Sequence, residues 1–119
     1  MKLRQIITLL QADVLVGEED LIDDVEVDSC FSADLMSDVL GREHANGIMI
    51  TGITNPQSIR TADIADIKAV CLVRGKQPEA ETLSLARQKR IPLCMTKMTT
   101  FEACGILYMN GLRAVAERR

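Results

Sequence analysis

Hydrophobic residues along the chain fall into short unbroken runs, separated by polar stretches in which apolar positions recur at helical spacing. Three of the runs lie at 48–50, 69–73 and 91–95. Short runs rich in β-branched residues are typical of strands covered on both faces, as in a parallel sheet. We therefore predict three central strands. Pro92 should lie near the beginning of the third, because proline cannot donate to a central ladder.

Helical patterns fill the segments between these strands. Asn55 and Pro56 predict the start of one helix, and Pro78 is predicted in the first turn of the next. Thr99 followed by Glu102 has the spacing of a capping box and predicts a third helix start. Strands joined by helices of this length run parallel, with right-handed crossovers.

The first third of the chain shows weaker patterns. In order, we expect a helix at 2–11, a strand at 14–16, a solvated acidic loop at 18–24, an edge strand at 25–28, and a helix at 33–40 capped by Ser32. Residues 112–119 are expected to form a helical extension or a frayed tail. The whole predicts one domain over residues 1–119, a three-layer α/β/α sandwich with a mostly parallel sheet of about five strands.

Composition narrows the classes of function. The hydrophobic fraction of 47% and the charged fraction of 26% are those of a globular domain. Aromatic residues make up 3%, net charge is −3, and no basic stripe appears, which argues against a nucleic-acid-binding surface. No apolar run approaches bilayer length and no secretory leader is recognisable, so we expect a cytoplasmic protein without a membrane segment.

The four cysteines lack the close sequence spacing of metal sites and redox dithiols. Cys71 and Cys94 are expected inside strands and Cys104 on the inner face of a helix, where cysteine acts as a small hydrophobe. Cys30 is predicted on a turn, where it would be exposed and open to reaction. We predict no metal and no cofactor.

The candidate chemistry lies in the loops that follow the three central strands, because ligands of open parallel sheets bind at the carboxyl ends of the strands. These loops combine small hydroxyls, glycines and cations, which suit an anionic or nucleotide-like ligand. The predicted ligand-binding residues are Thr51, Gly52, Thr54, Asn55, Arg74, Gly75, Thr96 and Thr99. Helix capping alone also accounts for most of these residue types. Neither a phosphate loop nor a catalytic triad is recognisable, so no enzyme activity is predicted.

Two segments carry a family resemblance: FSADLMSDVLG at Phe31–Gly41, and the passage from Ile67 to Leu112 that contains VRGKQPEAE and IPLCMTKMTTFE. With them the chain resembles the DRTGG domain, a relative of the N-terminal domain of HPr kinase/phosphorylase. The signature itself is not intact, because DSCFSA stands at 28–33, and the kinase domain with its phosphate loop has no counterpart here. The resemblance implies an α/β/α fold and a regulatory or scaffolding role.

Two functions follow as hypotheses. The first is a non-catalytic regulatory domain that binds a small anionic or nucleotide-like ligand at the strand ends. The alternative is a protein-interaction module, a homodimer that docks onto a larger redox enzyme assembly, suggested by the edge strand at 25–28 and by Met36 and Met98 as surface residues. A metal carrier using Cys30 is disfavoured, because two of the four thiols are expected to be buried.

Overall fold

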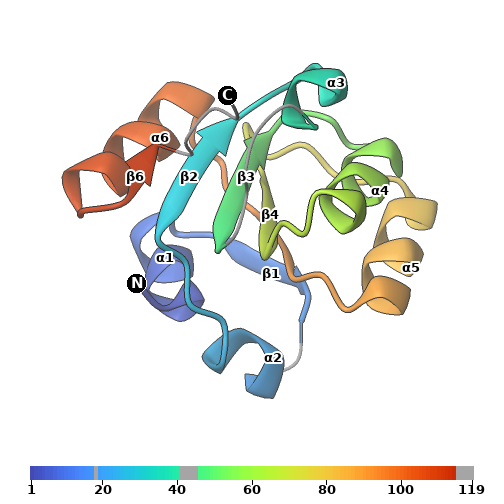
Figure 1. The fold of residues 1–119 in the computed structure, drawn as a ribbon, viewed down its shortest axis with the longest axis horizontal. Coiled ribbons are helices and arrows are strands. Elements are labelled where there is room, and N and C mark those ends of the chain that lie inside the picture. The colour runs from blue at the N-terminus through green and yellow to red at the C-terminus, as the bar shows by residue number, and fades with distance from the viewer. Residues whose placement is uncertain (18, 41–45, 115–119) are drawn as a thin grey trace.

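The structure, a computed structural model, describes residues 1–17, 19–40 and 46–114. Within these ranges helices and strands alternate along most of the chain (Figure 1). The helices are α1 (Leu3–Leu9), α2 (Glu19–Asp23), α3 (Met36–Val39), α4 (Gln57–Ile64), α5 (Ala80–Lys89) and α6 (Thr100–Met109). The strands are β1 (Asp13–Val16), β2 (Ser29–Ser32), β3 (Gly47–Thr51), β4 (Ala69–Leu72), β5 (Leu93–Met95) and β6 (Arg113–Ala114).

The described strands form one six-stranded sheet in the order β1-β5-β4-β3-β2-β6. The strand β1 is antiparallel to β5, and every other neighbouring pair is parallel. Helices α4 and α5 cover one face, and α1 and α6 cover the other (Figure 1). The predicted three-layer α/β/α class with a mostly parallel sheet is therefore confirmed, with one strand more than expected.

Side chains of the central strands alternate between two hydrophobic clusters. Ile48 and Ile50 of β3 pack with α1 and α6, whereas Met49 between them packs with α4. All three side chains are completely buried. A strand covered on both faces needs apolar residues at every position, and this requirement produces the unbroken runs seen in the sequence.

Helix ends in the second half follow the sequence signals. The Oδ1 atom of Asn55 accepts the N–H of Gln57 at 2.9 Å, which caps α4 behind Pro56. The hydroxyl of Thr99 accepts the N–H of Glu102 at 3.2 Å in a complete capping box. Pro78 lies two residues before α5 rather than in its first turn.

The first third of the chain departs from several predictions. The acidic segment contains the helix α2, anchored by the buried Ile22, instead of a loop. Residues 25–28 do not form the edge strand, since their backbone groups bond to the N-terminal residues and Asn46, with Glu26 in an isolated bridge to Lys2. The strand is Ser29–Ser32, so Ser32 ends β2 and does not cap a helix.

Three further expectations concern side chains and the tail. The helix expected at 33–40 is reduced to α3, with Met36 buried and Leu35 exposed. Met98 packs against the core instead of lining a surface. Arg113 and Ala114 form β6 beside β2 rather than a helical extension. Gly41, His44 and residues 115–119 lie outside the described ranges.

Candidate functional site

The carboxyl ends of β3, β4 and β5 meet at one rim of the sheet. The three strands are neighbours and parallel, and hydrogen bonds continue the pairing past their ends. The N–H of Val73 donates to the carbonyl of Thr51 at 3.2 Å, and the N–H of Thr96 donates to Leu72 at 2.8 Å. The loops after these strands are thereby held side by side, as the parallel order required.

A tight turn after β4 directs Arg74. Arg74 and Gly75 have φ angles of 59° and 64°, and the N–H of Lys76 donates back to the carbonyl of Val73 at 3.3 Å. Two successive positive φ angles are the mark of a type I′ turn, which glycine adopts freely and arginine does not. The turn is also attached to the next loop, because the N–H of Arg74 donates to Met98 and that of Gly75 to Thr96, both at 2.8 Å.

Charged side chains converge on Gly52. A methyl group added there would lie 3.4 Å from Nη2 of Arg74, 3.6 Å from Oδ1 of Asp34 and 3.7 Å from Nζ of Lys76. All three side chains are exposed, so they are available to solvent. Lys97 passes the same turn, with its Cγ 3.7 Å from where a methyl group on Gly75 would lie. The rim therefore carries three cations and one carboxylate around two glycines.

Asp34 organises this rim, and the sequence prediction missed it. Its Oδ1 accepts the N–H of Gly52 at 2.9 Å and the hydroxyl of Thr51 at 3.2 Å. It stands two residues after β2, so it belongs to the same edge of the sheet as the predicted loops. In the sequence pattern Asp34 falls within the helix predicted at 33–40. Its position just after a strand was the signal that could have identified it.

The predicted threonines at the strand ends hold the structure together. Thr51 and Thr96 are each 1% exposed. The hydroxyl of Thr96 donates to the carbonyl of Leu10 at 2.6 Å and accepts the N–H of Met98 at 3.2 Å. The hydroxyl of Thr51 accepts the N–H of Ile53 at 3.1 Å in addition to its bond to Asp34. Both hydroxyls thus join strand ends to neighbouring loops.

The remaining predicted polar residues secure helix beginnings. The carbonyl of Thr54 accepts the N–H of Glu79 at 3.1 Å and the hydroxyl of Thr82 at 2.7 Å, which fastens the start of α5. Asn55 caps α4 and Thr99 caps α6, as described above. Three of the eight predicted residues belong to the charged part of the rim. Arg74 contributes one of the converging charges, and Gly52 and Gly75 contribute the backbone beside these charges.

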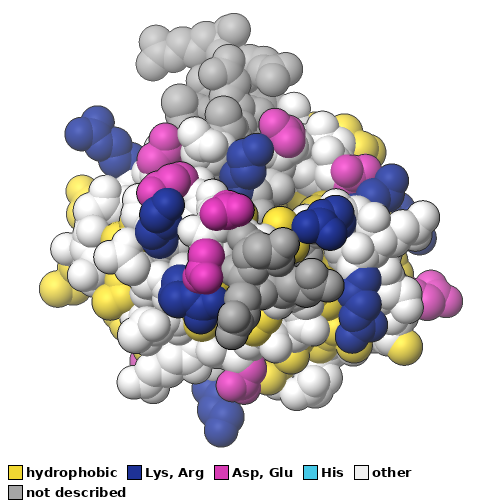
Figure 2. Space-filling view, turned by 90° about the horizontal axis from the view of Figure 1, so that it is seen from below, with side chains coloured by type: hydrophobic (Ala, Val, Ile, Leu, Met, Phe, Trp, Pro, Cys, Tyr) yellow, Lys and Arg dark blue, Asp and Glu magenta, His cyan; other side chains and the backbone are white. Residues whose placement is uncertain are grey.

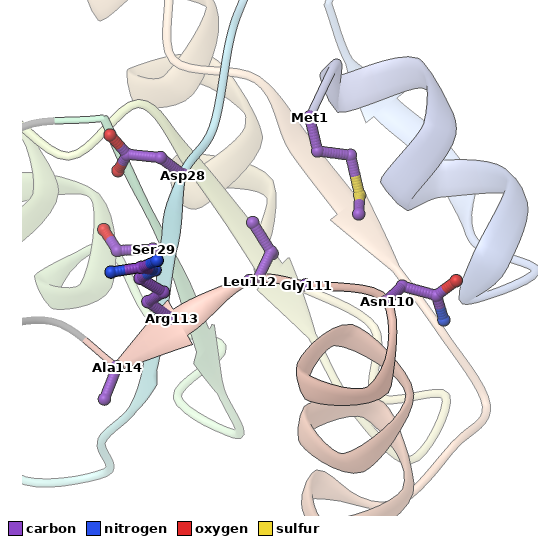
Figure 3. A pocket seen from close by; sticks show the side chains of 8 residues that line it. All are labelled: Met1, Asp28, Ser29, Asn110, Gly111, Leu112, Arg113 and Ala114. Carbon is purple, nitrogen blue, oxygen red and sulfur yellow. The ribbon is translucent and has the colours of Figure 1, made fainter.

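A hollow lies at the opposite end of β2 from Asp34. It measures about 550 Å³ and is lined by Met1, Asp28, Ser29, Asn110, Gly111, Leu112, Arg113 and Ala114 (Figure 3). It contains none of the predicted residues, and its charged side chains are one cation and one carboxylate, Arg113 and Asp28. The face seen in Figure 2 likewise shows Lys and Arg mixed with Asp and Glu. The rim around Gly52 brings together more cations than this hollow, since Arg74, Lys76 and Lys97 compare with Arg113.

Within the described ranges, no group of three His, Cys, Asp or Glu side chains is placed to hold a metal ion. None of the helices in these ranges is long and apolar enough to cross a bilayer. Cys30 was predicted on a turn, but it lies on the strand β2. Cys71 and Cys94 are buried in β4 and β5, as predicted.

Comparison with known proteins identifies the family. The family model of the DRTGG domain matches residues 5–109, which is most of the chain. The chain belongs to the DRTGG domain family. A solved structure with the same fold contains the CBS and DRTGG domains of the regulatory region of Clostridium perfringens pyrophosphatase, complexed with the activator diadenosine tetraphosphate.

The two folds superpose with a TM-score of 0.73 at 15% sequence identity, over 99% of this chain and 51% of that chain. This DRTGG domain therefore spans about half the length of the pyrophosphatase region. No curated protein matches the sequence. At this level of identity the similarity to the pyrophosphatase region shows a shared fold. This fold and the family match both agree with the resemblance recognised in the sequence.

Proposed function

We propose that this DRTGG domain is a non-catalytic regulatory domain that binds a small anionic or nucleotide-like ligand at the carboxyl rim of β3 and β4. The observation that supports this most directly is the convergence of Arg74 and Lys76 on Gly52. Arg and Lys are the usual partners of phosphate, and a glycine between them lets a phosphate oxygen approach the backbone.

The charge balance favours an anion over a cation. Asp34 already accepts two hydrogen bonds from Gly52 and Thr51, so its role is to hold the loop that the cations face. Among the side chains that the structure describes at this rim, Arg74, Lys76 and Lys97 stand against the one carboxylate of Asp34. Because these side chains are exposed, the attraction is screened by salt, and binding should weaken as ionic strength rises.

The nucleotide part of the proposal is supported by the pyrophosphatase region, in which a DRTGG domain occurs beside CBS domains in a complex with a dinucleotide activator. A regulatory domain needs no catalytic groups, because its effect comes from a difference in ligand affinity between two states of the protein that contains it.

The test is thermal unfolding of the chain with ATP, ADP, AMP, diadenosine tetraphosphate, pyrophosphate and phosphate, each at low and high salt. We expect at least one to raise Tm, because a ligand at 100 times its Kd stabilises by about 2.7 kcal/mol. Arg74→Gln with Lys76→Gln should abolish the shift. Lys68→Gln, at the opposite end of β4, is the matched control and should retain it.

Gly52→Val tests the same rim without changing charge. Its added methyl groups would fill the space between Arg74 and Lys76, so the ligand shift should disappear while the unliganded domain stays folded. The proposal is wrong if none of the six compounds raises Tm, or if the shift survives both the charge and the glycine substitutions.

A second candidate function, a homodimeric interaction module, is supported by the outer face of α6. Phe101, Tyr108 and Met109 are 87%, 76% and 85% exposed. Their spacing places them on one side of the helix, and a side chain at Gly105 between them would have open space around it. Large apolar side chains gathered on a surface commonly mark an interaction site.

The partner best suited to this face is a second copy of the chain. Phe101 and Met109 each lie four residues from Gly105, so two antiparallel α6 helices crossing at Gly105 would place Phe101 of each copy against Met109 of the other. Docking onto a larger redox assembly is a further role for such a dimer. Light scattering should show a dimer that Phe101→Asp converts to a monomer, whereas Ile64→Asp, at an exposed position of α4, should not. A monomer at high concentration would contradict the proposal.

A further inference from the structure

The fold gathers four cysteines that are far apart in the sequence. Cys71 of β4 and Cys94 of β5 are register partners in neighbouring strands. Cys30 of β2 and Cys104 of α6 lie on the same side of the sheet, packed against the cluster that α1 and α6 cover. The thiols thus form two pairs on one face of the sheet.

The pair formed by Cys30 and Cys104 joins a strand to the helix above it. Their thiols lie close enough for each to shift the pKa of the other, and Ser32 lies near enough to Cys104 to affect it as well. Cα atoms of α6 and β2 come within 8 Å of one another. Both residues are half-buried, whereas Cys71 and Cys94 are 0% and 4% exposed. A reagent from solvent therefore has access to this pair and not to the other.

The two thiols of the accessible pair differ in acidity. The neighbouring thiol of Cys30 lowers the pKa of Cys104 to about 7, with help from Ser32 and against the effect of burial. The neighbouring thiol of Cys104, together with burial, raises the pKa of Cys30. A thiolate beside a protonated thiol is the arrangement of an attacking cysteine with its resolving partner. The neighbouring Cys94 and burial raise the pKa of Cys71. Both thiols of this inner pair are closed off from reagents in solvent, because Cys71 and Cys94 are buried.

We propose that Cys30 and Cys104 are a redox-active pair, a site of thiol modification that closes to a disulfide between β2 and α6 when a low-molecular-weight disulfide is the oxidant. The thiolate of Cys104 attacks one sulfur of the oxidant, forms a mixed disulfide and expels one thiolate. Cys30 then loses its proton and attacks the Cys104 sulfur, which expels the second thiolate.

The reaction balances. Two protein thiols lose two electrons, the oxidant is reduced to two thiols, and the protons of Cys30 and Cys104 end on these products. The first step also prepares the second, because the Cys104 thiolate no longer raises the pKa of Cys30 once its sulfur is bonded to the reagent. The bond would tie together the two elements that flank the Gly52 rim, since β2 precedes Asp34 and α6 follows Lys97. The pair itself does not depend on a ligand at that rim.

The experiment treats the folded chain with oxidised glutathione near pH 7, blocks remaining thiols with iodoacetamide and maps the products by mass spectrometry. We expect a Cys30–Cys104 crosslink, two hydrogen atoms lighter than the reduced chain and reversed by dithiothreitol. Cys71 and Cys94 should be alkylated only after denaturation, which makes them an internal control in the same sample.

Two variants separate the steps. In Cys30→Ser the reaction should stop at a glutathione adduct on Cys104, and in Cys104→Ser neither adduct nor crosslink should form at Cys30. In the wild-type chain, iodoacetamide should alkylate Cys104 roughly tenfold or more faster than the buried thiols. The proposal is overturned if the folded chain forms no crosslink, if Cys71 and Cys94 crosslink instead, or if Cys104 reacts no faster than they do.

Discussion

Single hydroxyl groups join the strand ends to the rest of the molecule. Thr96 connects β5 to the loop after α1, across 86 residues of sequence, and Thr51 connects β3 to Asp34. Both threonine side chains are buried; the bond from Thr96 to Leu10 is made away from water, whereas that from Thr51 reaches the exposed Asp34. A buried polar group that loses its partner pays the full cost of leaving water, which makes these residues important to stability whether or not a ligand binds.

At Thr96 this argument gives a measurable expectation. Thr96→Val keeps the shape of the side chain but leaves the carbonyl of Leu10 without its hydroxyl donor and the N–H of Met98 without its acceptor. We expect a loss of about 1–3 kcal/mol in the free energy of unfolding, measured by urea titration. Thr8→Val, which removes an exposed hydroxyl bonded to Arg4, should cost much less. Equal losses in the two variants would contradict this role.

Val70 tests the centre of the sheet. It lies in β4 between β3 and β5 and is completely buried. Val70→Asp would bury an unpaired charge at a cost of several kcal/mol, comparable with the whole stability of a domain of about 5–15 kcal/mol. We expect insoluble or unfolded protein by circular dichroism. Val14→Asp on the edge strand β1, where the side chain is 42% exposed, should remain folded.

The parts of the site that could be predicted are those marked by neighbouring residues in the sequence. Arg74 and Gly75 follow directly after an apolar run, so the sequence placed them at a strand end. The direction of the Arg74 side chain comes from the type I′ turn, and the approach of Lys76 and Asp34 comes from contacts between separate loops. Neither leaves a pattern in the residues themselves. Two of the polar residues predicted to bind, Asn55 and Thr99, cap helices instead.

At the scale of elements, strands with a strong hydrophobic pattern were predicted correctly. The prediction was wrong where two segments compete for the same backbone hydrogen bonds. The runs that became β3, β4 and β5 are apolar because both faces are covered. Val25 and Val27 alternate with acidic residues as an edge strand would, but the N–H of Val27 donates to Met1 and the carbonyl of Val25 accepts from Leu3. The N-terminal residues thus occupy the backbone groups of this segment. The strand beside β3 is Ser29–Ser32, where the sequence predicted a turn at Cys30.

The start of α6 carries a pH-dependent contribution to stability. The backbone N–H of Thr99 and the hydroxyl of the same residue donate to the carboxylate of Glu102. These two bonds lower the pKa of Glu102 below its ordinary value of 4.5. An acid whose pKa is lower in the folded state stabilises the fold fully above its unfolded pKa. This contribution is lost as pH falls through the folded pKa.

Glu102→Gln isolates this effect, because glutamine keeps a capping oxygen but carries no charge. We expect the wild type to have the higher Tm near neutral pH and the difference to shrink as pH drops below about 4.5. Glu81→Gln in the first turn of α5 is the matched control for the loss of one acidic charge. A Tm difference that stays constant from neutral to acid pH would show that the charge of Glu102 has no such role.

At the scale of the molecule, one sheet separates two hydrophobic clusters that share the same strands. Ile6 belongs to the cluster under α1 and α6, and Ile59 belongs to the cluster under α4. Both side chains are completely buried. Alternate residues of β3, β4 and β5 face opposite clusters. If either layer of helices unfolded, it would expose the same strands against which the other layer packs.

This arrangement predicts one cooperative unfolding transition for the chain. Calorimetry should give equal van't Hoff and calorimetric enthalpies, near 80 kcal/mol at Tm from about 0.7 kcal/mol per residue. Ile6→Ala and Ile59→Ala should each cost about 2–5 kcal/mol and lower the same single transition, although they lie on opposite faces. Separate transitions in either variant would mean that the two helix layers unfold independently, and the sheet would then not unite residues 1–119 into one domain.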